Sequence, residues 1–459
     1  MPAMGSATTA NPSYGCIRGS MLAWLVCGAL ASTAVVAQSE PGVQDPVPSA
    51  NEAADPADAA PAESPDTVRF GPVPEAPNPI ARSERLVTST VEQFGAKSLQ
   101  AAEAYFELAD AHRQAEQHEL AAENYLLAVE SYRAVDGAFT PLAIAPLTSL
   151  GDNYHEANDD RNAVTAYTEA RTISRRAYGL HNPEQVELLD RLSVSLLDLN
   201  QPTEAEAQQI EALRLMQRAH PPASDAVLDA IYKYAEWLGS RGQYQLERDQ
   251  YERARRIVRQ AYGDNDLRHV QPLLGIGNTY RRERNPAGLG ISSLQDALSI
   301  LLEQPQRDAV TIATTLRDIG DWTVAFGKTG YEGTEYQRAW QLLEAVPNGE
   351  ELRREWFTGA NYVLYEPISP RSLSMDPDAP NGYVTVRFDL DTDSSSQNVT
   401  LVESNPVGLK DEAVLRHIRR SRFRPLLVNG EIVPGKGLGI QVTFRYLPEG
   451  ADPDDEDDD

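Results

Sequence analysis

Residues 151–170, GDNYHEANDDRNAVTAYTEA, begin with a glycine and end with an alanine that stands 19 residues further on. The same spacing between an early small residue and a late alanine returns along the chain, once with one residue more. The six pairs are Ala109 and Ala128, Gly151 and Ala170, Ser193 and Ala212, Ala235 and Ala254, Gly277 and Ala297, and Gly320 and Ala339. Successive late alanines are 42 or 43 residues apart, which indicates a repeat protein.

Each unit has the pattern of two antiparallel helices. In five of the six units a large side chain such as Tyr167 stands three residues before the late alanine, as a tight helix crossing requires. Turn-forming residues such as Asn158 separate the two helices. The units are divided by the helix-stopping residues Gly137, Gly179, Pro221, Gly263, Pro305 and Pro347. We therefore expect a mainly α protein with an α-solenoid of about six helix pairs over residues 81–350.

This pattern resembles the tetratricopeptide repeat, which carries a small residue, an alanine and an aromatic residue at these spacings in a unit of usually about 34 residues. The longer unit, with Tyr178-Gly179-Leu180-His181-Asn182-Pro183 at a joint, is similar to the repeats of kinesin light chains. The roughly eight extra residues would lengthen a helix pair by about two turns. The resemblance implies a surface that binds proteins or peptides.

The first 80 residues predict export followed by a tether. Residues 21–37, MLAWLVCGALASTAVVA, are the strongly apolar run and end in small residues, so residues 1–37 are interpreted as a signal peptide. A retained signal anchor stays open, because 17 residues reach the short limit of a membrane span. Both cysteines, Cys16 and Cys27, lie in this leader. Residues 38–80 are rich in Pro, Ala and acids, which predicts a disordered linker.

The chain is strongly acidic. Its formal net charge is −27, from 68 Asp and Glu against 41 Lys and Arg. Such a surface repels nucleic-acid phosphates, so no nucleic-acid partner is expected, and the membrane is reached only through an uncleaved N-terminal segment. Residues 448–459 form an acidic tail that is interpreted as disordered.

After a second expected linker at residues 351–379, the apolar period changes from that of helices to that of strands. Val384, Val386, Phe388 and Leu390 alternate with polar residues, and a turn leads to a second strand near residues 398–403. A helix over residues 409–420 and a strand over residues 438–446 follow. The order predicts a small α+β domain with an antiparallel sheet over residues 380–447.

This domain resembles the C-terminal domain of TonB-type energy transducers. The matching residues are Gly382-Tyr383-Val384-Thr385-Val386-Arg387-Phe388, Val402-Glu403-Ser404-Asn405-Pro406-Val407-Gly408-Leu409, Ala413, Arg422-Phe423-Arg424-Pro425 and Gly430-Glu431-Ile432-Val433. The resemblance implies a periplasmic location and an outer-membrane TonB-dependent transporter, or another envelope protein, as the partner. It also implies that the partner adds a strand at a sheet edge. The edge strand that we expect contains Ile440, Val442, Phe444 and Tyr446.

A groove row of mostly acidic residues is expected inside the solenoid. On tetratricopeptide helices the residue after the early small position faces the inside of the superhelix. That position and its neighbours give the row Asp110, Asp152, Asp190, Asp198, Glu236, Asn278 and Asp321. The row would attract a basic peptide segment. Ordinary solvated positions are an equal alternative, because the chain is acidic throughout.

One basic patch is predicted in the C-terminal domain. It consists of Arg416, Arg419, Arg420, Arg422 and Arg424. Its candidate ligands are lipid phosphate, an acidic partner loop and the acidic tail. Pairing with Asp411, Glu412 and water is the plain alternative.

Motifs of catalysis and cofactor binding are missing from the sequence. It contains no glycine-rich phosphate loop, no Gly-x-Ser-x-Gly elbow and no histidine pair with zinc spacing, so we predict no enzyme, no cofactor and no metal site. The predicted function is a periplasmic scaffold for protein–protein interactions. The alternative is a true energy transducer in transmembrane transport, anchored in the inner membrane. Residues 21–37 lack the ionisable residue that coupling to a proton channel requires, which favours the scaffold.

Overall fold

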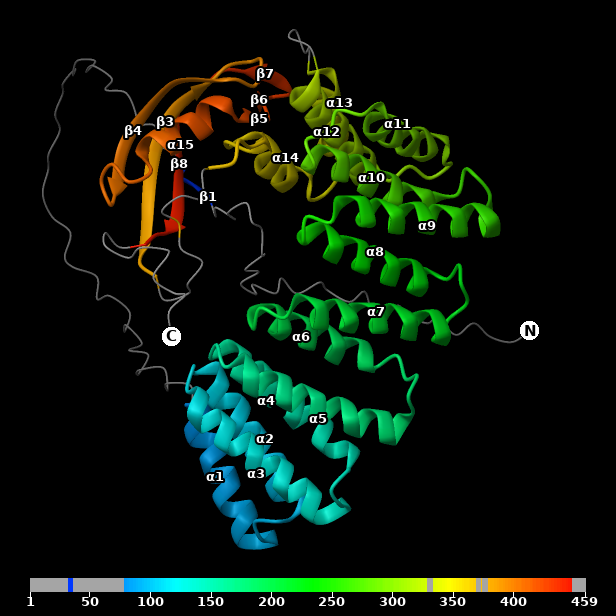
Figure 1. Cartoon of the computed structure of the whole chain (residues 1–459), viewed down its shortest axis with the longest axis vertical. Coiled ribbons are helices and arrows are strands. Elements are labelled where there is room, and N and C mark those ends of the chain that lie inside the picture. Colours follow the sequence, from blue (N-terminus) through cyan, green and yellow to red (C-terminus); the bar gives the residue numbers. More distant parts are fainter. Residues whose placement is uncertain (1–31, 36–77, 328–332, 369–372, 374–378, 448–459) are drawn as a thin grey trace, which may run out of the picture.

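The computed structural model describes residues 32–35, 78–327, 333–368, 373 and 379–447. Most of the predicted signal peptide, the linker before Asn78 and the acidic tail lie outside the described residues. A curved stack of helices leads into a small sheet domain at its C-terminal end (Figure 1). Among the helices of this described part, none is long and apolar enough to cross a membrane.

The six predicted helix pairs are present. They are α2 (Leu99–Gln114) with α3 (His118–Asp136), α4 (Ile144–Glu156) with α5 (Asp160–Tyr178), α6 (Gln185–Asp198) with α7 (Pro202–Ala219), α8 (Asp225–Ser240) with α9 (Tyr244–Tyr262), α10 (Val270–Arg282) with α11 (Gly288–Glu303), and α12 (Ala309–Phe326) with α13 (Thr334–Glu344). Short 3₁₀ turns, η1 (Pro141–Ala143) and η2 (Leu267–His269), precede α4 and α10. Helix α1 (Pro79–Phe94) packs on α2, and α14 (Gly349–Phe357) follows the last pair. The predicted α-solenoid is confirmed.

Small residues lie where the two helices of a pair cross. A Cβ atom added at Gly151 would stand 2.3 Å from the ring of Tyr167, and one added at Gly320 would stand 2.6 Å from the ring of Tyr336. The late alanines are buried, and five are wholly so: Ala128, Ala170, Ala254, Ala297 and Ala339. The tyrosine of the second helix therefore fills the space that the small residue of the first helix leaves.

Each of the first five pairs turns at one residue in the left-handed region of the backbone. These residues are 42 positions apart: Glu116 (φ 57°), Asn158 (φ 60°), Asn200 (φ 56°), Gly242 (φ 71°) and Arg284 (φ 59°). Asparagine and glycine adopt this conformation most readily. The single 43-residue step between late alanines therefore falls after Arg284, in the turn between α10 and α11.

The C-terminal domain has the predicted order of elements. Strands β3 (Asn381–Leu390) and β4 (Ser396–Asn405) form a hairpin, α15 (Asp411–Arg420) packs on it, and β8 (Gly435–Arg445) pairs with β3. The alternate residues Val384, Val386 and Phe388 are buried with Val414 and Ile418 of α15. Two short pairs complete the domain: β2 (Tyr362–Leu364) with β5 (Arg422–Phe423), and β6 (Leu426–Val428) with β7 (Glu431–Val433).

The segment 351–379, which we predicted to be a linker, contains folded structure instead. It holds most of α14 and the strand β2. Trp356 and Phe357 are buried in one core with α12, α13 and Leu427 of β6. These few apolar residues follow no clear period, which explains why the sequence pattern did not reveal the helix. The solenoid and the sheet domain therefore share a hydrophobic core.

Candidate functional site

Three acids of the groove row accept a hydrogen bond from a tyrosine of their own repeat. The hydroxyl of Tyr125 donates to Asp110 at 2.6 Å, that of Tyr167 to Asp152 at 2.8 Å, and that of Tyr336 to Asp321 at 2.8 Å. The tyrosine always lies 15 residues after the acid. The acid thus orients the ring that fills the helix crossing. These tyrosines were not among the predicted site residues, although their constant spacing identifies them.

Other contacts of the row join neighbouring repeats. Arg191 Nε donates to Asp152 Oδ1 at 2.7 Å. Lys233 forms an ion pair with Asp190, which also accepts a hydrogen bond from Gln209 at 3.2 Å. Part of the negative charge that we expected to attract a basic ligand is therefore compensated within the protein. Because these pairs remain partly exposed, their contribution to stability is small, about 1 kcal/mol or less.

The negative charges of two acids of the groove row, Glu236 and Asp198, are less well compensated by neighbouring cations. Burial raises the pKa of Glu236, although Arg282 and Lys233 act in the opposite direction. Burial and the charge of Asp160 raise the pKa of Asp198. A raised carboxyl pKa means that the environment disfavours the negative form, so a cation bound nearby would stabilise it.

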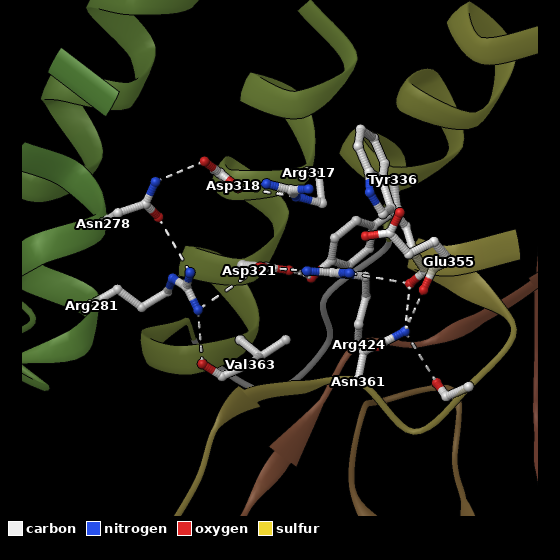
Figure 2. A network of polar contacts seen from close by, with 12 residues as sticks. Asn278, Arg281, Arg317, Asp318, Asp321, Tyr336, Glu355, Asn361, Val363 and Arg424 are labelled. Carbon is white, nitrogen blue, oxygen red and sulfur yellow. Dashed lines mark hydrogen bonds and ion pairs between the residues drawn. The ribbon is translucent and has the colours of Figure 1, made fainter. Parts of the chain in front are cut away.

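Asp321, the last member of the row, does not line an open groove. It is 1% exposed, and Arg424 of the sheet domain binds it through two parallel hydrogen bonds (Figure 2). Arg424 Nη1 also donates to the Trp356 carbonyl at 3.2 Å, and the Arg424 main-chain N–H to the Asn361 carbonyl at 2.8 Å. The predictions of Asp321 as a groove residue and of Arg424 as part of the basic patch are therefore corrected: both residues lie at the junction between the two parts.

Polar contacts surround this ion pair. Arg281 Nη1 donates to the Val363 carbonyl at 3.0 Å and lies 3.9 Å from the Asp321 carboxylate. Asn278, another member of the groove row, donates to Asp318 at 2.8 Å and accepts from Arg281 Nη2 at 3.3 Å, so it borders the junction through Arg281 (Figure 2). Burial alone would raise the pKa of Asp321, but the adjacent Arg424 and Arg281 hold it below its ordinary value. Asp321 is therefore ionised at neutral pH.

A second set of contacts links the two parts through the segment after β2. Arg284 of the solenoid lies 3.2 Å from Glu366, and Arg420 of α15 lies 3.6 Å from the same carboxylate. The buried His417 on α15 faces the Tyr362 hydroxyl at 2.9 Å from Nε2, and its Nδ1 contacts the Glu366 carbonyl. Burial lowers the pKa of His417. The neutral imidazole is therefore the form that this site favours.

The other arginines of the basic patch are exposed. Arg416, Arg419 and Arg420 lie on α15, and Arg422 lies on β5. Anion binding at these four residues stays a prediction. Its intramolecular candidate, the acidic tail, lies outside the described residues.

The predicted edge strand corresponds to β8. Its second neighbour is β1 (Ser32–Val35), which pairs in antiparallel fashion with Ser32 opposite Val442. Tyr446 lies past the end of β8, in a bridge with Leu373. Ile440, Val442 and Phe444 are at most 8% exposed and pack in the domain core. These three side chains are therefore core residues and do not form a partner-binding surface; only the main chain at the outer edge of β8, which β1 occupies in this structure, is placed for strand addition.

Comparisons with known families agree with the resemblances that the sequence indicates for both parts of the chain. Models of the family described as "Tetratricopeptide repeat" match residues 100–176 and 186–224. The model described as "Gram-negative bacterial TonB protein C-terminal" matches residues 379–446. The chain thus contains tetratricopeptide repeats and a TonB-type C-terminal domain, which associates it with protein–protein interaction and with the Gram-negative envelope.

Solved structures with similarity include repeat proteins of the kinesin light chain type. A putative kinesin light chain repeat protein of Podosopora anserina is 15% identical over 44% of this chain and 94% of its own, with a TM-score of 0.35. BtubC (BKLC) from P. vanneervenii is 16% identical over 66% of this chain and 98% of its own, with a TM-score of 0.30. A comparison with curated proteins found no match.

Proposed function

We propose that this chain, in which tetratricopeptide repeats precede a TonB-type C-terminal domain, is a non-enzymatic periplasmic scaffold that connects an envelope protein to a second protein partner. The repeats supply an extended binding surface. We infer the contact with an envelope protein from the outer edge of β8. Within residues 379–447 no strand pairs with that edge, and β1 from the leader pairs there instead.

The pairing of β1 supports strand addition as the binding mode. Four residues of an extended segment align antiparallel to β8, from Ser32 opposite Val442 to Val35 opposite Gly439. Main-chain hydrogen bonds of this kind supply affinity without a dedicated pocket. Removal of residues 1–37 would also remove β1 and leave the edge to a partner. The partner that the TonB-type domain suggests is an outer-membrane transporter or another envelope protein.

Site-specific photo-crosslinking in intact cells tests this proposal. A photoreactive side chain at Thr443, which is exposed on β8, should form a covalent adduct with an outer-membrane protein. The matched control places the same group at Thr400, which is exposed on β4 at the opposite edge of the sheet. Equal adducts from both positions, or none from Thr443, would contradict binding at the β8 edge.

For the second partner, we propose that the groove row of the first four repeats binds a basic segment. The incompletely compensated Glu236 supports this charge preference. A fluorescent lysine-rich peptide should bind the full chain with an affinity that falls as salt rises. Glu236→Gln should weaken binding severalfold, whereas Glu350→Gln on the exposed end of α14 should not. Equal affinity in both variants would count against the groove.

A further inference from the structure

Three side chains that can bind a metal ion, one histidine and two aspartates, meet between the second and third repeats. His155 lies near the end of α4, Asp160 is the first residue of α5, and Asp198 is the last residue of α6. His155 Nδ1 is 2.7 Å from Asp160 Oδ1 and 3.8 Å from Asp198 Oδ2. One ligand atom of each residue lies within 4.8 Å of the others. Three helices thus bring one imidazole nitrogen and two carboxylates together.

These distances fit the first coordination shell of a small divalent cation. A zinc ion binds nitrogen and oxygen at about 2.0 to 2.2 Å, so two ligand atoms of a tetrahedral site are roughly 3.4 Å apart. The two observed separations from His155 Nδ1, 2.7 and 3.8 Å, lie on either side of that value. Side-chain shifts below about 1 Å would bring these two separations to that value. The side chains are 35%, 11% and 29% exposed for His155, Asp160 and Asp198, so an ion can enter from solvent.

The charge of the cluster exceeds what the local fold requires. At the turn between the helices of the first repeat, His112 stands one position before the equivalent of His155, and its Nδ1 contacts the neutral amide oxygen of Gln117 at 2.7 Å. A histidine thus holds that turn without any carboxylate. In the second repeat, Asp160 and Asp198 instead place two carboxylates beside the ring of His155. A divalent cation would compensate both carboxylates.

We propose that His155, Asp160 and Asp198 form a binding site for a divalent transition metal ion of the zinc class. The imidazole nitrogen favours such an ion over calcium or magnesium, which prefer shells made entirely of oxygen. Three protein ligands leave at least one coordination position for water or for a side chain of a bound partner. The ion ties α4, α5 and α6 together. No linear motif reveals the site, because its ligands come from three helices and are five and 38 residues apart.

Isothermal titration with Zn²⁺ tests the proposal on the untagged full chain. The chain should carry Cys16→Ser and Cys27→Ser, because thiolates bind zinc independently of the site. We expect one zinc equivalent per chain. His155→Gln and Asp198→Asn should each weaken binding by about tenfold or more, since each removes one of three ligands.

Two control variants separate this site from general surface binding. His181→Gln removes another histidine, and Glu156→Gln removes the carboxylate next to His155, which pairs with Arg113 instead. Both should bind zinc like the parent chain. Circular dichroism of each variant confirms that the helices are retained. Absence of saturable binding in the parent chain would overturn the proposal, as would equal affinity in the ligand and control variants.

Discussion

The guanidinium of Arg424 binds both carboxylate oxygens of Asp321, with Nε 2.9 Å from Oδ1 and Nη2 2.8 Å from Oδ2. The same carboxylate accepts a hydrogen bond from the hydroxyl of Tyr336 in the last repeat. Side-chain exposure is 11% for the arginine and 1% for the aspartate, so the pair is largely shielded from bulk water. The two residues belong to different domains and are 103 residues apart in sequence.

The second repeat shows the same arrangement between two repeats. There Asp152 Oδ1 accepts both the Tyr167 hydroxyl at 2.8 Å and Nε of Arg191, from the following repeat, at 2.7 Å. The TonB-type domain therefore docks on the last repeat with the contacts that one repeat uses to dock on the next. The main difference is burial, because the Asp152 side chain is 24% exposed.

Enlarging a buried late alanine should disrupt a helix crossing. Ala170 and Ala254 are both 0% exposed, so Ala170→Leu and Ala254→Leu would overpack the core. We expect each change to lower the free energy of unfolding by about 1 to 3 kcal/mol. Urea denaturation followed by circular dichroism measures the loss. Leu126→Ala, at a side chain that is 50% exposed, is the control and should change stability little; unchanged stability in both alanine variants would contradict the repeat register.

A second overpacking prediction concerns the buried acid of the fourth repeat. Glu247 is 0% exposed and paired with Arg282, and a Cβ atom at Gly239 would stand 2.4 Å from its Oε2. Gly239→Ala should therefore destabilise the protein by about 1 to 3 kcal/mol, measured as the shift of the urea midpoint. Gly288→Ala adds its Cβ where no atom lies within 4 Å, and it should be neutral or slightly stabilising. A neutral Gly239→Ala would show that Glu247 can move aside.

Stability should fall on mild acidification because of His417. Burial lowers its pKa in the folded state, and Arg284 acts in the same direction while Glu366 acts against it. As the pH drops through about 6.5, the unfolded chain takes up the proton first, so the free energy of unfolding decreases. Denaturation between pH 7.5 and about 5.5 should show a smaller decrease in His417→Gln than in the parent chain. The surface variant His181→Gln serves as the control, and an identical pH slope in all three chains would contradict the role of His417.

Much of the fold could be predicted from the sequence because the decisive signals are local. The spacing of Gly151 and Ala170 reports one helix crossing, and its recurrence reports the stack. The alternation from Val384 to Leu390 likewise identified β3 as a strand with one buried face. Both patterns depend on neighbours within one repeat or one strand.

The docking contacts and the side-chain roles were not accessible in this way. Asp321 occupies the same repeat position as Asp152, but the next unit along the chain is a sheet domain, which covers it. Arg424 looked like one of five clustered arginines, and only the folded chain separates it from its exposed neighbours. The strand β8 was predicted from the sequence, yet the burial of the Val442 side chain in the domain core leaves only its main chain for a partner.

Whether the two domains form one unit is tested most directly by a double-mutant cycle on Asp321 and Arg424. The single changes Asp321→Asn and Arg424→Gln should each cost about 3 to 5 kcal/mol, because each leaves a buried group without its partner. The double variant should lose much less than their sum, with a coupling energy of about 2 kcal/mol or more. The parallel cycle on the more exposed Asp152 and Arg191 should give about 1 kcal/mol or less. Additive losses at Asp321 and Arg424, within about 0.5 kcal/mol, would contradict a junction held by this pair.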